Sequence, residues 1–271
     1  LTEFFRLNLI YYELISGKGL EFDKIKEYQP GGDTRRIDWK VFARTDKLFL
    51  RTYKEERDLN IVIVLDISDS MLLGTKENTK NEYGALIGGI LAYSATEAGD
   101  QVSGGVFSSK SREFVDPDID IISLIHTFSK KELYGGQKDW DTLVTELISN
   151  YEEDSIIFII SDFINSNPEK FLPELANRFS KTYGIMVRDP VDYELPEGVG
   201  KMYLKDPNTG KLHLADIETV REEYKIRAGL EMEKIQDAFH EYGQRCFAIT
   251  TGEDFSRTFI KAMGDEEVEI L

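Results

Sequence analysis

One carboxylate and two hydroxyl side chains follow a nearly continuous apolar stretch of this chain. The stretch runs over 60–65, and Asp66, Ser68 and Ser70 come next in an Asp-x-Ser-x-Ser pattern. A buried strand would deliver these side chains to the loop at its carboxyl end, where open α/β sheets place their ligand sites. Such oxygen ligands suit Mg²⁺, Ca²⁺ or Mn²⁺ rather than Zn²⁺. Because two of the three ligands are neutral, a bound cation would stay positively charged and could capture a carboxylate from another molecule.

Two further loops offer oxygen ligands of the same kind. Ser161 and Asp162 follow a second apolar run, and Asp141 and Thr142 open a predicted helix. Each loop alone is more typical of a helix cap or an Asx turn. Together, at one sheet edge, they could supply about five or six oxygens to an octahedral Mg²⁺, with water completing the shell. The predicted metal ligands are Asp66, Ser68, Ser70, Asp141, Thr142 and Asp162.

Strands and helices alternate along the chain from residue 60 onward. We expect strands over 60–66, 101–107, 112–115, 155–160, 182–187 and 246–250. We expect helices over 80–98, 118–128 (with Asp118 as its cap), 141–150, 168–180, 217–241 and 253–263, and a strand-and-turn excursion over 191–215. This alternation predicts an α/β fold with a doubly wound, mostly parallel sheet and helices on both faces.

The first 59 residues differ in composition from the rest. They are rich in charge, turns and aromatic residues, and short alternating runs such as Lys47–Tyr53 are typical of strands with one solvated face. We therefore predict a small β-rich module over 1–59, opened by a short helix near 3–15. The α/β domain would then span 60–271.

Composition narrows the partners that this chain can have. The formal net charge is −17 at pH 7, which argues against nucleic acid and against anionic membrane surfaces. No apolar run approaches the roughly 18–20 residues of a membrane span. The N-terminal residues lack the basic-then-apolar order of a signal peptide. We therefore expect a cytoplasmic protein with no membrane partner through this chain.

Enzymatic chemistry has little support in the sequence. The chain has no phosphate-binding Gly-x-x-x-x-Gly-Lys-Ser/Thr loop and no Gly-x-Ser-x-Gly elbow, and its one cysteine, Cys246, is predicted to be a buried hydrophobe. A Mg²⁺-dependent phosphoryl-transfer hydrolase could use Asp66 as nucleophile, but phosphatases of the haloacid-dehalogenase type need an aspartate two residues later, where this chain has Ser68. A metal site with a purely structural role is a third possibility. We expect a protein-binding adaptor rather than an enzyme.

Two sets of motifs resemble known families. Asp66-x-Ser68-x-Ser70, the later Asp/Thr loop and Asp162 resemble the metal-ion-dependent adhesion site (MIDAS) of von Willebrand factor type A domains. The block Tyr28-Gln-Pro-Gly-Gly-Asp-Thr-Arg-Arg-Ile-Asp-Trp39, with Gly19–Phe22 before it, resembles the signature of the "domain of unknown function 58" family, DUF58. The resemblance covers essentially the whole chain.

This resemblance implies a von Willebrand factor A-like fold, Mg²⁺ at the sheet edge and no known catalytic activity. It also implies a MoxR-type AAA+ ATPase as a partner, in the maturation or assembly of other proteins, and a protein ligand that supplies an acidic residue to the metal. One departure stands out, because the usual threonine ligand position falls on Asp141, and Thr142 comes one residue late. A second direct carboxylate there would lower the positive charge left on the cation.

Overall fold

The computed structural model describes Tyr11 and residues 22–27, 49–53, 59–116, 120–205 and 211–253. Apart from Tyr11, the helix predicted near 3–15 lies outside these residues, as do most of the predicted β-rich module and, after Glu253, the helix predicted over 253–263. Two strands of that module are described, β1 (Phe22–Glu27) and β2 (Phe49–Tyr53). They pair antiparallel, which agrees with the strand predicted around 47–53.

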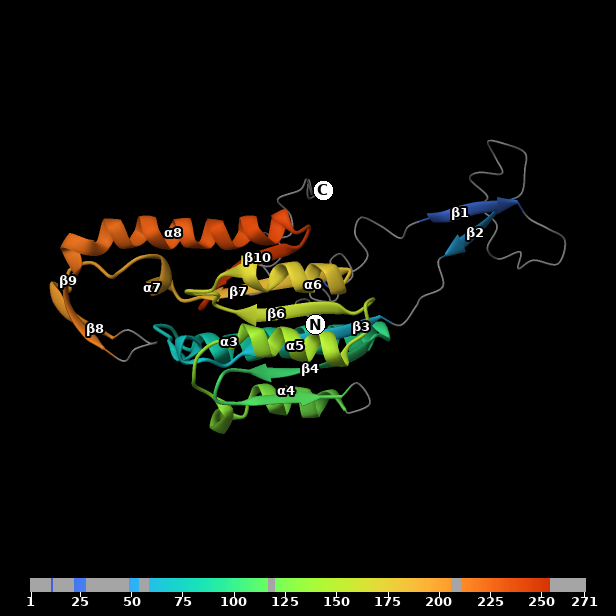
Figure 1. The fold of residues 1–271 in the computed structure, drawn as a ribbon, viewed down its shortest axis with the longest axis horizontal. Coiled ribbons are helices and arrows are strands. Elements are labelled where there is room, and N and C mark those ends of the chain that lie inside the picture. The colour runs from blue at the N-terminus through green and yellow to red at the C-terminus, as the bar shows by residue number, and fades with distance from the viewer. Residues whose placement is uncertain are drawn as a thin grey trace.

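Six strands form the central sheet, in the order β10-β7-β6-β3-β4-β5 (Figure 1). Every neighbouring pair is parallel except β4 with the edge strand β5. The bounds are β3 (Asn60–Asp66), β4 (Gln101–Phe107), β5 (Arg112–Val115), β6 (Ile156–Ser161), β7 (Lys181–Arg188) and β10 (Arg245–Thr250). The predicted α/β class and mostly parallel sheet are therefore confirmed.

Helices flank this sheet and follow the predicted order, except that a short helix, α7 (Pro190–Tyr193), overlaps the start of the predicted strand-and-turn excursion over 191–215, where the carboxylate of Asp189 caps it. Their bounds are α3 (Lys80–Ala98), α4 (Ile121–Phe128), α5 (Trp140–Asn150), α6 (Leu172–Arg178), α7 (Pro190–Tyr193) and α8 (Ile217–Glu241), with 3₁₀ turns η2 (Asp69–Leu72), η3 (Lys131–Leu133) and η4 (Pro168–Lys170). α4 begins later than predicted because the carboxylate of Asp120 accepts a hydrogen bond from the backbone N–H of Ile122. The predicted cap, Asp118, lies outside the described residues. Within these ranges no helix has the length and apolar character needed to cross a membrane.

The central strand β3 contributes side chains to two hydrophobic cores, one on each face of the sheet. Ile61, Ile63 and Leu65 pack with residues of α3 and α4 on one face of the sheet. Val62 and Val64 pack with residues of α5, α6 and α8 on the other face. Successive side chains of a strand point to opposite faces, so a strand covered on both sides needs an unbroken apolar sequence. This burial fixes the position of Asp66 at the end of the strand.

The predicted excursion over 191–215 contains a hairpin. β8 (Lys201–Lys205) pairs antiparallel with β9 (Leu212–Asp216). α8 starts directly after β9, and Figure 1 shows the hairpin at the end of α8 that lies away from β10. The hairpin exposes Tyr203, Leu212 and Leu214.

Two adjacent glycines of α3 should respond oppositely to alanine. A Cβ at Gly88 would lie 2.8 Å from Cε2 of Phe128, whereas a Cβ at Gly89 would meet only Ile125, at 3.7 Å. We expect Gly88→Ala to lower the free energy of unfolding by about 1–3 kcal/mol through overpacking. Gly89→Ala should raise it by roughly 0.5–1 kcal/mol, because glycine weakens a helix interior. Urea unfolding of both variants tests this packing, and effects of equal sign would contradict it.

Candidate functional site

β3 and β6 lie side by side where the sheet changes its direction of winding. From β3 the chain passes through α3 to β4 on one side, while β6 pairs with β3 on the other. The crevice outside the carboxyl ends of such strands is the usual ligand position in open α/β sheets. Leu65 pairs with Ile160, so the following residues, Asp66 and Ser161, come together at this edge.

Asp66 is fully buried, and both its carboxylate oxygens accept hydrogen bonds. The backbone N–H of Ser68 donates to Oδ1 at 2.8 Å, and the hydroxyl of Ser161 donates to Oδ2 at 2.6 Å. The first of these bonds turns the loop so that the hydroxyls of Ser68 and Ser70 lie 3.4 Å apart. The three residues of the Asp-x-Ser-x-Ser pattern therefore converge, as the sequence predicts.

Asp162, also fully buried, enters the same edge from β6. Its Oδ1 accepts a hydrogen bond from the backbone N–H of Ile164 at 3.0 Å. The turn that follows holds two non-glycine residues in the left-handed region, Phe163 at φ 52° and Asn165 at φ 56°. Such backbone costs of order 1–3 kcal/mol per residue and often marks functional sites. Phe163 is held there by stacking on Trp140, with ring centroids 5.5 Å apart.

A lysine absent from the predicted site lies among these oxygens. Nζ of Lys138 is 2.9 Å from Oδ1 of Asp162, 2.5 Å from the hydroxyl of Ser70 and 3.9 Å from Oδ2 of Asp66. Burial alone would lower the pKa of Lys138, but the negative charges of Asp162 and Asp66 outweigh it and raise that pKa above its ordinary value. The amine is therefore a buried ammonium ion. We call Asp66, Ser68, Ser70, Lys138 and Asp162 the edge cluster.

The loop before α5, which contains two glycines and is held by hydrogen bonds, places Lys138 at this position. Gly136 and Asp69 exchange hydrogen bonds: the N–H of Asp69 donates to the Gly136 carbonyl at 2.8 Å, and the N–H of Gly136 donates to Oδ1 of Asp69 at 3.1 Å. Gly135 and Gly136 have φ values of 110° and 89°, which side chains rarely adopt. A Cβ at Gly136 would also lie only 2.9 Å from the hydroxyl of Ser109. The Gly-Gly pair before Lys138 was the available sequence signal for this arrangement.

A second buried lysine supports Asp162 from its other side. Nζ of Lys80, in the first turn of α3, lies 2.7 Å from Oδ2 of Asp162 and 2.8 Å from Oδ2 of Asp192. The Lys80 side chain is 1% exposed and that of Lys138 11%. The edge cluster with Lys80 and Asp192 thus contains three carboxylates and two ammonium groups, a net charge of −1 when all are ionised.

The two ligands predicted on α5 make their hydrogen bonds within that helix. Thr142 donates from its backbone N–H and its hydroxyl to the two carboxylate oxygens of Asp139, at 3.1 and 2.7 Å, so Asp139 is the helix cap. Asp141 is exposed, and its carbonyl accepts a hydrogen bond from the hydroxyl of Thr145. This loop contributes Lys138 to the edge cluster, whereas the structure gives Asp141 and Thr142 no bond to Asp66, Ser68, Ser70 or Asp162 among the residues it describes.

The oxygens of the edge cluster suit a hard cation, and the ammonium of Lys138 holds the position between them. Carboxylates and hydroxyls are the donors that Mg²⁺, Ca²⁺ and Mn²⁺ prefer. However, no group of three or more Asp, Glu, His or Cys side chains in the described ranges is arranged to hold a metal. Since affinity for such cations grows with the number of charged ligands, two carboxylates and two hydroxyls would bind one weakly on their own. Ser68, Ser70, Asp66 and Asp162 thus fit a cation that they would bind weakly and that a further ligand would hold more tightly.

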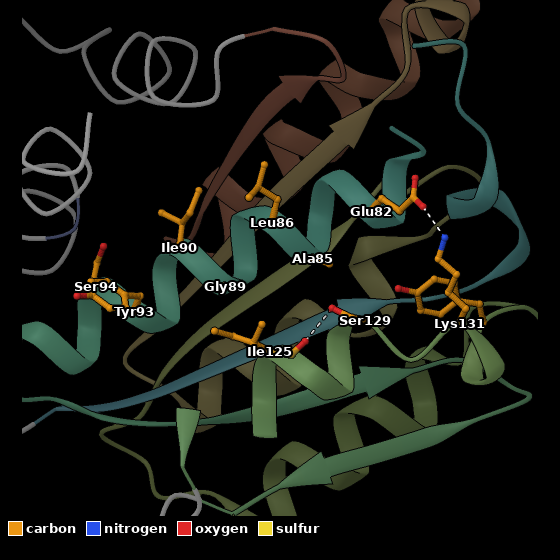
Figure 2. A pocket seen from close by; sticks show the side chains of 11 residues that line it. Glu82, Ala85, Leu86, Gly89, Ile90, Tyr93, Ser94, Ile125, Ser129 and Lys131 are labelled. Atoms are coloured by element: carbon orange, nitrogen blue, oxygen red, sulfur yellow. Dashed lines mark hydrogen bonds and ion pairs between the residues drawn. The ribbon is translucent and has the colours of Figure 1, made fainter. Parts of the chain in front are cut away.

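A groove of about 540 Å³ lies elsewhere, between α3 and α4 (Figure 2). Leu86, Ile90 and Ile125 give it a mainly apolar lining, and an ion pair between Glu82 and Lys131, 2.9 Å long, lies at one end. The groove contains fewer charged side chains than the edge cluster, so it is the weaker candidate for the functional site.

Comparisons with known proteins identify one family model. Residues 24–234, more than half of the chain, match the family described as "Protein of unknown function DUF58". Two similar relatives are the "Uncharacterized protein Rv1480" of Mycobacterium tuberculosis and the "Uncharacterized protein Mb1516" of Mycobacterium bovis. Each is 25% identical over 256 residues, which is 92% of this chain and 80% of the relative.

Two solved structures show a weaker likeness. The conserved hypothetical protein BatB from Bacteroides thetaiotaomicron has a TM-score of 0.46 at 14% identity, covering 76% of this chain and 96% of its own. The PilB minor pilin from Streptococcus sanguinis has a TM-score of 0.39 at 16% identity, covering 81% of this chain and 63% of its own.

Proposed function

The chain belongs to the DUF58 family, and we propose that it is a non-enzymatic adaptor that binds a protein partner at the β3–β6 edge through a divalent cation. The observation that carries this proposal is the convergence of Asp66, Ser68, Ser70 and Asp162 at the switch point of the sheet. The six-strand order and the antiparallel edge strand also support our assignment of the α/β domain to the von Willebrand factor A-like fold.

The residues of the edge have distinct tasks in this proposal. Ser68 and Ser70 would hold the ion, while Asp66 and Asp162 would balance its charge from buried positions. The predicted ligands Asp141 and Thr142 lie on the neighbouring helix, and either would need its loop to shift to join them. The bound ion, Mg²⁺ or in its place Ca²⁺ or Mn²⁺, would supply an open coordination position for a carboxylate. Because the protein ligands are few, an acidic side chain of the partner would complete the site.

The likeness of the motifs to adaptors of MoxR-type AAA+ ATPases makes such an ATPase the first partner to test. That pairing also supports the cytoplasm as the compartment, because the ATPase needs ATP. Maturation or assembly of other proteins is then the process that we propose for the pair.

An enzymatic role finds less support in the same geometry. A phosphoryl-transfer hydrolase would need the Asp66 carboxylate free to attack, but both its oxygens accept hydrogen bonds in a fully buried position. Ser68 occupies the place of the general acid and cannot replace it at neutral pH. Turnover of a generic phosphate ester that is lost in Asp66→Asn would favour the hydrolase over the adaptor.

The proposal predicts that Asp66→Ala abolishes Mg²⁺-dependent binding of the partner while the domain stays folded. Without this carboxylate the edge loses one of the two negative charges that would balance the charge of the ion. A pull-down of the MoxR-type ATPase by the full chain, with Mg²⁺ or with excess chelator, measures the effect, and circular dichroism checks the fold. Asp66→Asn, which leaves no cavity, should behave in the same way.

Asp154→Ala is the matched control, because Asp154 is exposed in the loop before β6, at the opposite end of the strands. It should bind like the wild type. Binding that persists undiminished in chelator contradicts the adaptor mechanism. A Mg²⁺-dependent gain in stability without any Mg²⁺-dependent binding would instead favour a structural metal site.

A further inference from the structure

Lys138 occupies the position that the proposed function gives to the metal. Its ammonium group contacts Ser70, Asp162 and Asp66, which are three of the four side chains that would surround the ion. We propose that Lys138 is the resident cation of the edge cluster, and that a divalent cation enters only when this side chain leaves. This inference rests on the proposed function and adds an internal competitor to it.

The charge of the buried groups favours replacement of Lys138 by the divalent cation over binding of both at once. With Lys138 in place, the three carboxylates and two ammonium groups carry −1. A divalent cation added beside Lys138 would bring this buried group to +1, with two cations in close contact. If the divalent cation replaces Lys138, the group is neutral. A carboxylate from a partner then restores −1, so exchange lets the partner bind without an excess of buried charge.

The two lysines differ in their freedom to leave. Lys80 is 1% exposed at the start of a long helix and bridges Asp162 to Asp192. Lys138 is 11% exposed and lies in a short loop. That loop is fixed on one side by the bonds between Gly136 and Asp69 and on the other by the cap at Asp139. Because the backbone is held at both ends, the flexible Lys138 side chain can swing out while the loop stays in place.

Competition of this kind reduces the apparent affinity of the site. If the ammonium occupies the cluster in more than about nine molecules in ten, the apparent affinity for a divalent cation falls at least tenfold. The Lys138→Met variant, of similar length but without charge, removes the competitor. We expect it to bind Mn²⁺ at least about tenfold more tightly than the wild type. We also expect Mn²⁺ to raise its melting temperature more than that of the wild type.

Isothermal titration with Mn²⁺ and thermal melts with Mn²⁺ or chelator provide these readouts on the full chain. Lys131→Met is the control, because Lys131 is 75% exposed and pairs with Glu82 outside the cluster. It should bind Mn²⁺ like the wild type. Equal Mn²⁺ affinities of Lys138→Met and the wild type overturn the competition but leave the metal site standing. Absence of Mn²⁺ binding in both overturns the competition and the proposed function together.

A second experiment uses the wild type alone and so does not depend on the folding of a variant. Lysine labelling by an amine-reactive reagent, followed by mass spectrometry, reports which amines are accessible. We expect Lys138 to be protected in chelator and to become labelled in saturating Mn²⁺. Lys80 should stay protected in both conditions and Lys131 labelled in both. Protection of Lys138 that Mn²⁺ leaves unchanged would overturn the proposal.

Discussion

Lys80→Met is expected to lower the free energy of unfolding by about 3–5 kcal/mol, the usual cost of removing one member of a buried ion pair. The Lys80 ammonium lies between Asp162 and Asp192, with 2.7 and 2.8 Å contacts, and its side chain is 1% exposed. Methionine fills most of the same space, so the loss would come from charge rather than from a cavity. Urea unfolding in chelator at neutral pH measures it.

Lys131→Met provides a comparison at nearly the same contact distance. Lys131 lies 2.9 Å from Glu82, but its side chain is 75% exposed. Surface ion pairs contribute only about 0–1 kcal/mol, so this variant should unfold almost like the wild type. Similar losses in the two variants would mean that the Lys80 ion pairs are no stronger than a surface contact.

Asp162→Asn is expected to have the second large effect and should also lower the free energy of unfolding by about 3–5 kcal/mol. Asparagine would leave Lys138 and Lys80 without the carboxylate that both contact. Asp66→Asn should change stability by no more than about 1 kcal/mol. Its amide oxygen can still accept the bond from the N–H of Ser68, and its amide nitrogen can donate to the hydroxyl of Ser161. Equal losses in the two variants would contradict this division of roles.

The acid dependence of stability separates the same two carboxylates. Burial alone would raise the pKa of Asp162, but the charges of Lys138 and Lys80 outweigh it and hold that pKa well below its ordinary value of 3.8. Its contribution is therefore complete above that ordinary value and is lost as the pH falls through the lower, folded value. Burial raises the pKa of Asp66, so protonation of Asp66 on acidification works in the opposite direction. Asp162→Asn should flatten the loss of stability below about pH 4, and Asp66→Asn should leave that loss in place.

The fold was predictable because its elements carry strong local signals. β3 and β6 are unbroken apolar runs of the kind that sheets covered on both faces require. The predicted bounds of α8, 217–241, agree with the structure. Convergence of Asp66, Ser68, Ser70 and Asp162 followed from a general property of parallel sheets, whose strands end at a common edge.

Lys138 could not be predicted in the same way. Lysine side chains are almost never fully buried unless they are paired. For any one of the 33 lysine and arginine residues of the chain, the expectation from sequence is therefore an exposed side chain. Lys138 is buried by tertiary contacts, because the hydrogen bonds between Gly136 and Asp69 bring its loop against η2. Lys80 was missed for the same reason, since its partner Asp192 is 112 residues away. The helix cap at Asp139 was also missed, because Asp139 and Asp141 both stand near the start of α5 and sequence alone does not rank them.

In the proposed mechanism, the β3–β6 edge holds a divalent cation in exchange for Lys138. Anomalous diffraction from crystals of the full chain grown in saturating Mn²⁺ tests it most directly, because Mn²⁺ is located without reference to any assumed ligand. We predict an anomalous peak beside the hydroxyls of Ser68 and Ser70, with the Lys138 amine turned away from Asp162. An edge without a peak, in which the Lys138 amine still bridges Ser70 and Asp162, would contradict the account.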